Sequence, residues 1–372
     1  MVESMARATV STVVAVQAYD LVQSGQKVSV LFTAVSLTAL MVSLLIPALM
    51  RHVSRGTVYV AGAAILALAA VAFTTFTIPG QLLGMLLRVV GSACLNITLS
   101  LYILDHIKRT DLVKAEPLRL ALSTVSWTVG PYAGVWLYTS HGPWAPQAFS
   151  ALWALLLVVI FHFLKLSVGT RARQAPNPHP LRSVRRFIAQ PRLRLAWMIA
   201  FSRSCFWATF FTYAPLLLIT EGMSKEAGGI LVSLGNITLV TALVFGKMAQ
   251  GFGVRRVIGA ALLVCAGLSL LTGVSGLAHL PLLAGVLLWI GTIAASALDG
   301  VGGIPFLRAV RAHERAEMSG VYRTYLDFSD LLPNVIFSFA LLYMPLAGVF
   351  IILSLWLAIA GVTAWRYLPA SM

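Results

Sequence analysis

A stripe of polar residues near the C-terminal end interrupts an otherwise apolar run. Arg323, Asp327, Asp330 and Asn334 are spaced by four, three and four residues, and this spacing places them on one face of a helix. Two carboxylates one turn apart in a medium of low dielectric constant should not both stay ionised, so at least one is expected to hold a proton. The stripe therefore predicts proton binding and release. The alternative is a structural ion pair between Arg323 and Asp327.

Isolated charges interrupt other apolar runs. A charge inside a membrane costs roughly 3 kcal/mol on insertion scales, so each such residue is a functional candidate. They are Arg7 and Asp20 in the first run, Arg88 in the fourth, Arg203 in the seventh and Asp299 in the tenth. Structural explanations stay open, because Asp20 and Asp299 lie near the ends of their runs, where solvated positions are common. Arg203 could meet a substrate anion, or it could pair with Asp299 or Asp327.

The elements that must position these residues are membrane-spanning helices. Of the 372 residues, 59% are apolar and only 10% are charged, with a mean hydropathy of +0.88. A soluble domain is about half apolar and about a quarter charged, so this composition excludes a soluble enzyme. Eleven apolar runs are long enough to span a bilayer, and a shorter stretch over 6–23 is interpreted as a truncated first helix. The eleven runs cover about 27–50, 58–78, 81–104, 119–139, 146–166, 195–219, 228–250, 257–277, 281–306, 318–343 and 346–368.

Basic residues gather in the connections on one side of the predicted helices. The chain carries 27 Lys and Arg against 12 Asp and Glu, a formal net charge of +15. The connections on the opposite side hold only two lysines or arginines, Lys27 and Lys225. By the positive-inside pattern, the basic side and both termini face the cytoplasm, and we expect a multi-pass protein of the cell (inner) membrane. Topology and attraction to lipid therefore explain the positive charge, and no nucleic-acid partner is expected.

The longest connection divides the chain into two halves of equal helix count. It covers 167–194 and combines arginines with four prolines. We therefore predict an all-α integral membrane protein with one six-helix bundle over 1–166, a cytoplasmic linker loop over 167–194 and a second six-helix bundle over 195–372. This layout is typical of secondary transporters built from parallel repeats.

A Gly-Pro motif lies in the fifth predicted span, 119–139, when the short stretch over 6–23 is counted as the first. Its residues Gly130, Pro131 and Gly134 resemble the motif that antiporters of the major facilitator superfamily carry there. The proline removes a backbone hydrogen bond and the glycines allow helices to approach closely, so the motif predicts a bendable packing point. The alternative is an ordinary proline kink.

Two further segments are similar to motifs of the same family. The loop that follows the eighth span has Gly246, Gly253 and Arg255 in place, with Gln250 where an acid is usual. In the family, that acid contacts a helix dipole and locks the outward-facing state. Arg88 resembles the intramembrane arginine that the family often uses in proton coupling.

The resemblance implies a transporter fold that works by alternating access around a cavity lined by spans one, four, seven and ten. We expect proton-coupled export of a small organic solute by antiport, with Asp327 and Asp330 as proton carriers. Arg88 and Arg203 would set the charge preference. Proton-coupled uptake of a nutrient or metabolite, or a transport-inactive membrane sensor, are the alternatives.

An enzyme embedded in the membrane is not expected. It would need a nucleophile with a base, or a metal cluster, at depth, and the sequence has no HExxH, GxSxG or Cys/His grouping. We expect no cofactor and no metal. The expected partners are the solute, protons and the lipid bilayer, and the protein is expected to be a monomer.

Overall fold

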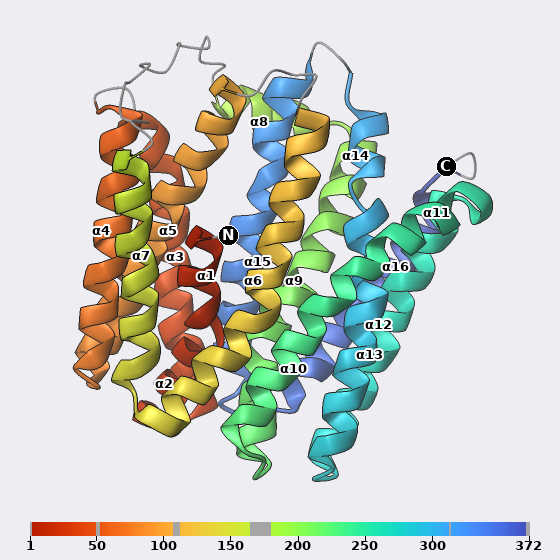
Figure 1. The fold of residues 1–372 in the computed structure, drawn as a ribbon. Coiled ribbons are helices and arrows are strands. Elements are labelled where there is room, and N and C mark those ends of the chain that lie inside the picture. Colours follow the sequence, from red (N-terminus) through yellow and green to blue (C-terminus); the bar gives the residue numbers. More distant parts are fainter. Residues whose placement is uncertain (1, 50–52, 107–111, 164–179, 312–313, 370–372) are drawn as a thin grey trace. The chain divides into compact units, whose positions relative to one another are not determined.

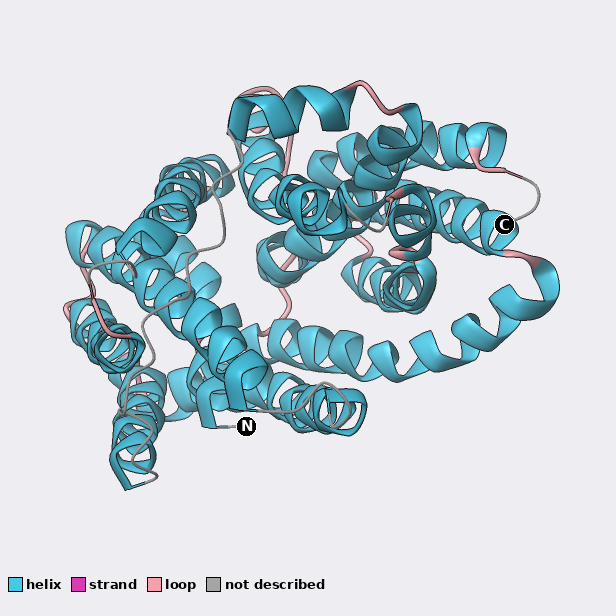
Figure 2. Cartoon of the chain, turned by 90° about the horizontal axis from the view of Figure 1, so that it is seen from above, coloured by secondary structure: helices cyan, strands magenta, loops and turns pink. Residues whose placement is uncertain are grey.

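The computed structural model describes residues 2–49, 53–106, 112–163, 180–311 and 314–369. Within these ranges the chain forms helices joined by turns and loops, and no strand (Figure 1 and Figure 2). A segment that crosses lipid must satisfy its backbone N–H and C=O groups internally, and a helix does this. The all-α fold predicted from the sequence is confirmed.

The chain separates into two compact units. Unit 1 consists of residues 1–174 and 225–233, and unit 2 of residues 175–224 and 234–372. Helix α10 (Lys225–Ile237) therefore begins in unit 1 and ends in unit 2.

Unit 1 contains the helices before the predicted linker. They are α1 (Val2–Thr9), α2 (Ser11–Val22), α3 (Gly25–Leu49), α4 (Arg55–Thr74), α5 (Ile78–His106), α6 (Leu112–His141) and α7 (Trp144–Phe163). Helix α4 packs against α5 and α7, which lie beside it in Figure 1, and α1 packs against α6 and α7. One apolar cluster around Leu66 and Leu95 joins α4, α5 and α7. A second around Val14 and Phe73 joins α2, α3, α4 and α5.

Unit 2 contains the later helices. They are α8 (Pro180–Ile188), α9 (Pro191–Thr220), the 3-10 helix η1 (Thr238–Thr241), α11 (Ala242–Phe252), α12 (Val254–Leu277), α13 (Pro281–Val301), α14 (Ile304–Ala309), α15 (Arg315–Ala340) and α16 (Gly348–Tyr367). Helix α12 packs against α13 and α16, whereas α9 contacts α13, α15 and α16. Most side chains in the second half of α9 are buried, so this helix lies inside the unit.

The described part of the predicted linker is helical, not a loop. Residues 180–194 contain α8 and the first turn of α9, while 167–179 lie outside the described residues. Phe187 is 3% exposed and packs into an apolar cluster with α9, α14 and α15. Arg186 forms an ion pair with Glu314, directly before α15. An apolar anchor and an ion pair thus hold α8 to unit 2, although arginines and prolines alone indicated a loop.

Seven helical segments in the described part of the chain are long and apolar enough to cross a membrane. They are Gly25–Val42, Gly56–Thr74, Ile78–Asn96, Lys225–Phe252, Val254–Leu277, Pro281–Ala309 and Gly348–Tyr367. The predicted spans 195–219 and 318–343 form the long helices α9 and α15, but charged and polar residues interrupt their apolar character. These two helices carry Arg203 and the polar stripe.

The glycines of the Gly-Pro motif lie where α6 meets the junction of α1 and α2. Helix α1 ends at Thr9 and α2 begins at Ser11. A Cβ atom on Gly134 would lie 1.7 Å from the carbonyl oxygen of Thr9, and one on Gly130 would lie 2.6 Å from the Cβ of Ala8. Only glycine therefore fits this close approach of two helices.

The first part of α10 is held to unit 1 by polar contacts at both of its ends. The backbone N–H of Tyr132 in α6 donates to Ser233 Oγ at 3.1 Å. Lys225 Nζ lies 2.5 Å from Asp20 Oδ2, which also accepts a hydrogen bond from Tyr138 OH at 2.6 Å. Asp20 is therefore paired, because the fold brings a lysine and a tyrosine from distant parts of the chain to its carboxylate.

We expect Gly134→Ala to disrupt the contact between α6 and the α1–α2 junction. Overpacking of this kind costs about 1–3 kcal/mol, so purified protein should unfold at a lower temperature than wild type. Gly267→Ala on α12 is the matched control, because a Cβ there would meet open space and alanine favours helix. An unchanged unfolding temperature for Gly134→Ala would contradict the close approach.

Candidate functional site

An ion pair lies within the helices of unit 2. Arg203 Nη1 on α9 donates to Asp299 Oδ1 on α13 at 3.0 Å, and each side chain is 22% exposed. Opposite charges in contact lower the high cost of placing either one among apolar helices. Of the partners considered for Arg203, the structure provides Asp299.

Aromatic side chains complete the surroundings of this pair. Trp207 Nε1 donates to the second carboxylate oxygen, Asp299 Oδ2, at 2.9 Å. Trp207 follows Arg203 by one helical turn, so α9 presents both donors to one carboxylate. Arg203 Nη2 donates to Tyr325 OH on α15 at 3.2 Å, and the guanidinium carbon lies 5.5 Å from the centre of that ring. Both oxygens of Asp299 therefore have a donor, and Arg203 has a cation–π contact as well.

The pair has a chemistry suited to proton exchange. A proton on Asp299 would cancel its charge and weaken its bond to Arg203, whose remaining partners are Tyr325 OH and Ser204 Oγ, each at 3.2 Å. Among the described contacts, Arg203 Nε is buried without a hydrogen-bond partner. With Asp299 ionised the pair is neutral overall, and with Asp299 protonated it carries the positive charge of Arg203.

The stripe on α15 divides into a buried and an exposed part. Asn334 is buried, donates from Nδ2 to the backbone oxygen of Asp330 at 2.7 Å and accepts from Tyr213 OH at 2.7 Å. The side chains of Arg323 and Asp330 are exposed, and that of Asp327 is half-buried. Asn334 thus links α15 to α9, while the two carboxylates keep access to their surroundings.

Arg88 lies in a tightly packed part of unit 1. Its Nη2 donates to the backbone oxygen of Arg7 at 3.4 Å. Arg7 Nη1 in turn donates to Glu3 Oε1 at 2.9 Å and to Asn96 Oδ1 at 2.7 Å. The cavity that both arginines line has a volume of about 10 Å³, room for one water molecule at most. An organic solute does not fit beside Arg88 in this arrangement.

Three buried glutamines form polar links in unit 1 that the sequence analysis missed. Gln17 Nε2 donates to the backbone oxygen of Phe73 at 2.8 Å, and Gln147 Nε2 donates to Gln17 Oε1 at 3.2 Å. Gln81 Nε2 donates to the backbone oxygen of Val14 at 3.0 Å. Neutral amides do not stand out in an apolar run as charges do, although a glutamine inside such a run is a signal for an interhelical hydrogen bond.

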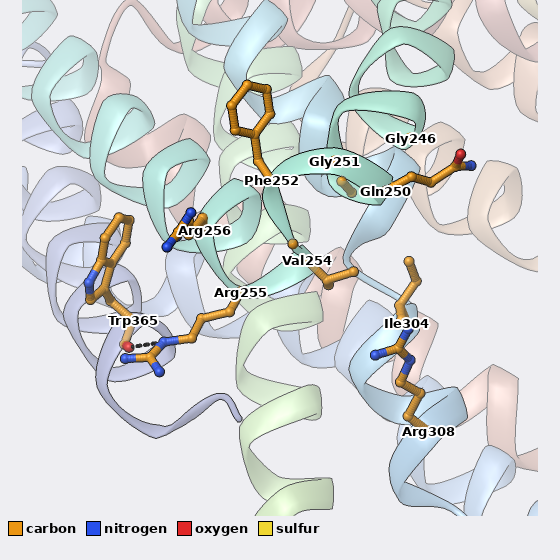
Figure 3. A pocket seen from close by; sticks show the side chains of 12 residues that line it. Gly246, Gln250, Gly251, Phe252, Val254, Arg255, Arg256, Ile304, Arg308 and Trp365 are labelled. Atoms are coloured by element: carbon orange, nitrogen blue, oxygen red, sulfur yellow. Dashed lines mark hydrogen bonds between the residues drawn. The ribbon is translucent and has the colours of Figure 1, made fainter. Parts of the chain in front are cut away.

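The glycine-rich loop motif forms the turn from α11 into α12. Gly253 has a φ of 88°, in the region that favours glycine, and α12 begins at the next residue. Arg255 Nε donates to the backbone oxygen of Trp365 near the end of α16 at 2.7 Å (Figure 3). A Cβ on Gly246 would meet open space. Of the three motif residues, Gly253 is therefore required by the turn and Arg255 joins α12 to α16, whereas the surroundings of Gly246 do not require a glycine.

Removing one charge of the pair should destabilise the protein more than removing both. Arg203→Gln leaves the Asp299 carboxylate without its cation, and breaking a buried pair costs about 3–5 kcal/mol. Because each side chain is 22% exposed, we expect the lower end of that range. The double variant Arg203→Gln/Asp299→Asn should recover most of the loss in thermal unfolding. If the loss of stability in the double variant equals the sum of the losses in Arg203→Gln and Asp299→Asn, the two residues are not coupled.

Comparison with known proteins gives the family and the fold. A model of the Major Facilitator Superfamily matches residues 1–332, whereas a search of curated proteins finds no match. A solved POT family transporter in complex with 5-aminolevulinic acid has a TM-score of 0.76 at 10% identity, covering 98% of this chain and 93% of that one. The POT family transporter PepTSo has a TM-score of 0.77 at 11% identity, covering 98% and 96%. The nucleoside transporter NupG has a TM-score of 0.74 at 14% identity, covering 99% and 98%.

At these identities the solved structures show a shared fold and nothing finer. The family and the fold are those of transporters, not of enzymes. Because the family match extends over most of the chain, this multi-pass membrane protein belongs to the major facilitator superfamily.

Proposed function

We propose that this protein exports a small organic solute in exchange for protons, as a secondary transporter that works by alternating access. Secondary transport rests on the family match and on the transporter fold of the similar structures. The observation that carries the coupling is the ion pair between Arg203 and Asp299. A proton and a cationic group of the solute can each replace Arg203 at the same carboxylate. They therefore compete for it, and competition at one site couples the two fluxes in opposite directions.

The surroundings of Asp299 favour an organic cation with an apolar body. Trp207 and Tyr325 contact the pair directly. Tyr322 lies beside Tyr325 with ring centres 5.2 Å apart, and Phe306 stacks on Tyr322 at 4.0 Å. Aromatic rings attract organic cations through their faces and bury apolar surface. We infer an amphipathic amine as the solute, in preference to a sugar or a phosphate.

Other residues have supporting roles in this proposal. Asp327 and Asp330 on α15 serve as further proton carriers, since their side chains are half-buried and exposed. Arg88 contributes to the charge preference from unit 1, where it contacts Arg7. The close contact at Gly134 supports the Gly-Pro motif as a packing point on which α6 can bend. We further propose that the protein is a monomer of the cell (inner) membrane with both termini in the cytoplasm.

Uptake of an anionic nutrient or metabolite together with protons is the second candidate. It is favoured by the buried Arg203 Nε, which lacks a hydrogen-bond partner among the described contacts. In this mechanism a proton on Asp299 frees Arg203 to bind a carboxylate or phosphate of the solute. The proton and the solute then bind together and move in the same direction.

Asp299→Asn should remove the response of solute flux to a pH gradient, because an amide keeps an acceptor for Arg203 but does not take up a proton. The solute is first selected by a thermal-shift screen of an organic-amine and organic-acid panel across pH. In proteoliposomes, a pH gradient should then drive flux at least about tenfold faster in wild type than in the variant, a difference of about 1.4 kcal/mol. Exchange of labelled for unlabelled solute without a gradient should persist in the variant but require a higher solute concentration, because the amide oxygen still accepts a hydrogen bond from the amine but no longer offers a negative charge.

Glu221→Gln is the matched control for this experiment. Its carboxylate, at the end of α9, bonds to His279 at 2.7 Å and lies apart from the ion pair. This variant should keep the wild-type response. Solute movement against the proton flux supports export, whereas movement with the proton flux supports uptake. Full gradient response in Asp299→Asn would exclude the ion pair as the coupling site.

Asp327→Asn and Asp330→Asn should each flatten the pH dependence of flux in the same proteoliposomes. Each substitution removes one of two carboxylates that lie one turn apart on α15, and with it a group that can bind a proton in this environment. The flux is measured at several pH values on both sides of the membrane. Wild-type pH dependence in both variants would remove the stripe from the mechanism.

A further inference from the structure

A polar pocket of about 880 Å³ lies at the turn between α11 and α12 (Figure 3). Three arginines line it: Arg255 and Arg256 come from the first turn of α12, and Arg308 comes from α14. None of the described lining residues is acidic. The position at which the family usually has an acid is Gln250, which lines the pocket and carries no charge. The pocket is therefore strongly electropositive.

The backbone at this turn adds to the positive potential. Helix α12 begins at Val254, and no side chain caps its first N–H groups. These groups have no partner within the helix and, with the helix dipole, favour an anion at this end. Arg255 is oriented by its hydrogen bond to the backbone oxygen of Trp365, at 2.7 Å. The helix end and the three arginines together suit a phosphate group.

An apolar groove of about 460 Å³ adjoins this pocket. The two share Phe252, Arg256 and Trp365 as lining residues. The rest of the groove is apolar and comes from α11, α12 and α13, including Val264 and Ile290, which are 50% and 39% exposed. Both α12 and α13 are among the helices apolar enough to cross a membrane. The groove therefore offers a surface for an acyl chain.

We propose that this composite site binds one anionic phospholipid, with its phosphate among Arg255, Arg256 and Arg308 and an acyl chain in the groove. Charge complementarity selects a headgroup with net negative charge, because no acidic side chain lines the pocket to neutralise the arginines. The adjoining groove distinguishes a lipid from a soluble phosphate, which would gain nothing from apolar walls. The lining residues come from α11, α12, α14 and α16, so bound lipid joins these four helices and stabilises unit 2. This inference does not depend on the direction or coupling of transport.

The test measures thermal unfolding of the purified full-length protein in detergent with four additives. Phosphatidylglycerol should raise the unfolding temperature in a saturable way. Phosphatidylcholine with the same acyl chains should have a smaller effect, because its headgroup has no net charge, and diacylglycerol should have little effect. Glycerol phosphate tests for a soluble anion. An equal shift with phosphatidylcholine, or a full shift with glycerol phosphate alone, would overturn the proposal.

Variants on the polar side locate the headgroup. Arg256→Gln and Arg308→Gln should each weaken phosphatidylglycerol binding about fivefold, the contribution of one basic residue near an anionic lipid. Gln250→Asp should also weaken it, since it places a negative charge in the pocket. Arg192→Gln is the matched control, because Arg192 is an exposed arginine at the start of α9 that does not line the pocket. Equal binding by the control and by all three pocket variants would contradict the assignment.

One variant on the apolar side separates a lipid from a soluble anion. Ala260 is exposed and lines the groove, so Ala260→Phe fills the groove from its rim without touching the buried core. It should reduce the shift caused by phosphatidylglycerol and leave the protein's unfolding temperature without lipid near that of wild type. An undiminished phosphatidylglycerol shift in Ala260→Phe would show that the groove takes no acyl chain.

Discussion

A charged side chain among membrane-spanning helices is too costly to leave uncompensated, and this constraint organises the interior of both units. Arg203 meets Asp299 in unit 2, whereas Lys225 meets Asp20 and Arg7 meets Glu3 in unit 1. A helix that carries such a charge must turn that face away from lipid. Helix α9, which carries Arg203, accordingly has most of its side chains buried from Ile199 to Leu218. Charge pairing thus explains how α9 can carry an arginine inside unit 2.

The same constraint separates polar groups that only stabilise from those that can also change state. Gln17 and Gln81 in unit 1 bond to backbone oxygens of neighbouring helices. A neutral amide neither takes up nor releases a proton, so these links stabilise the packing without changing charge. In the transport mechanism that we propose, the Asp299 carboxylate exchanges a cation for a proton, and its side chain keeps 22% exposure. An ionisable group that retains some access is the kind that can couple ion and solute movement.

The net positive charge at the turn between α11 and α12 results from one difference from the family motif, the uncharged Gln250. An acid at position 250 would supply negative charge beside Arg255 and Arg256, but the residue is Gln250. The excess positive charge is then available to a ligand from outside the chain. For a membrane protein the most abundant phosphate-bearing ligands are the lipids around it. The proposed lipid therefore accounts for both features: its phosphate would meet the arginines at the turn, and its acyl chain would fill the adjoining apolar groove.

Hydropathy and helical periodicity are local properties, so the sequence already predicts a helical, membrane-embedded chain. It also singled out Arg203 and Asp299, since charges stand out in apolar runs. It did not determine that these two are partners, because they are far apart in the chain and Asp327 was an equal candidate. The buried glutamine links and the attachment of α8 were likewise decided only by tertiary structure. Which helix faces which depends on the packing of all helices together, and no local spacing encodes that.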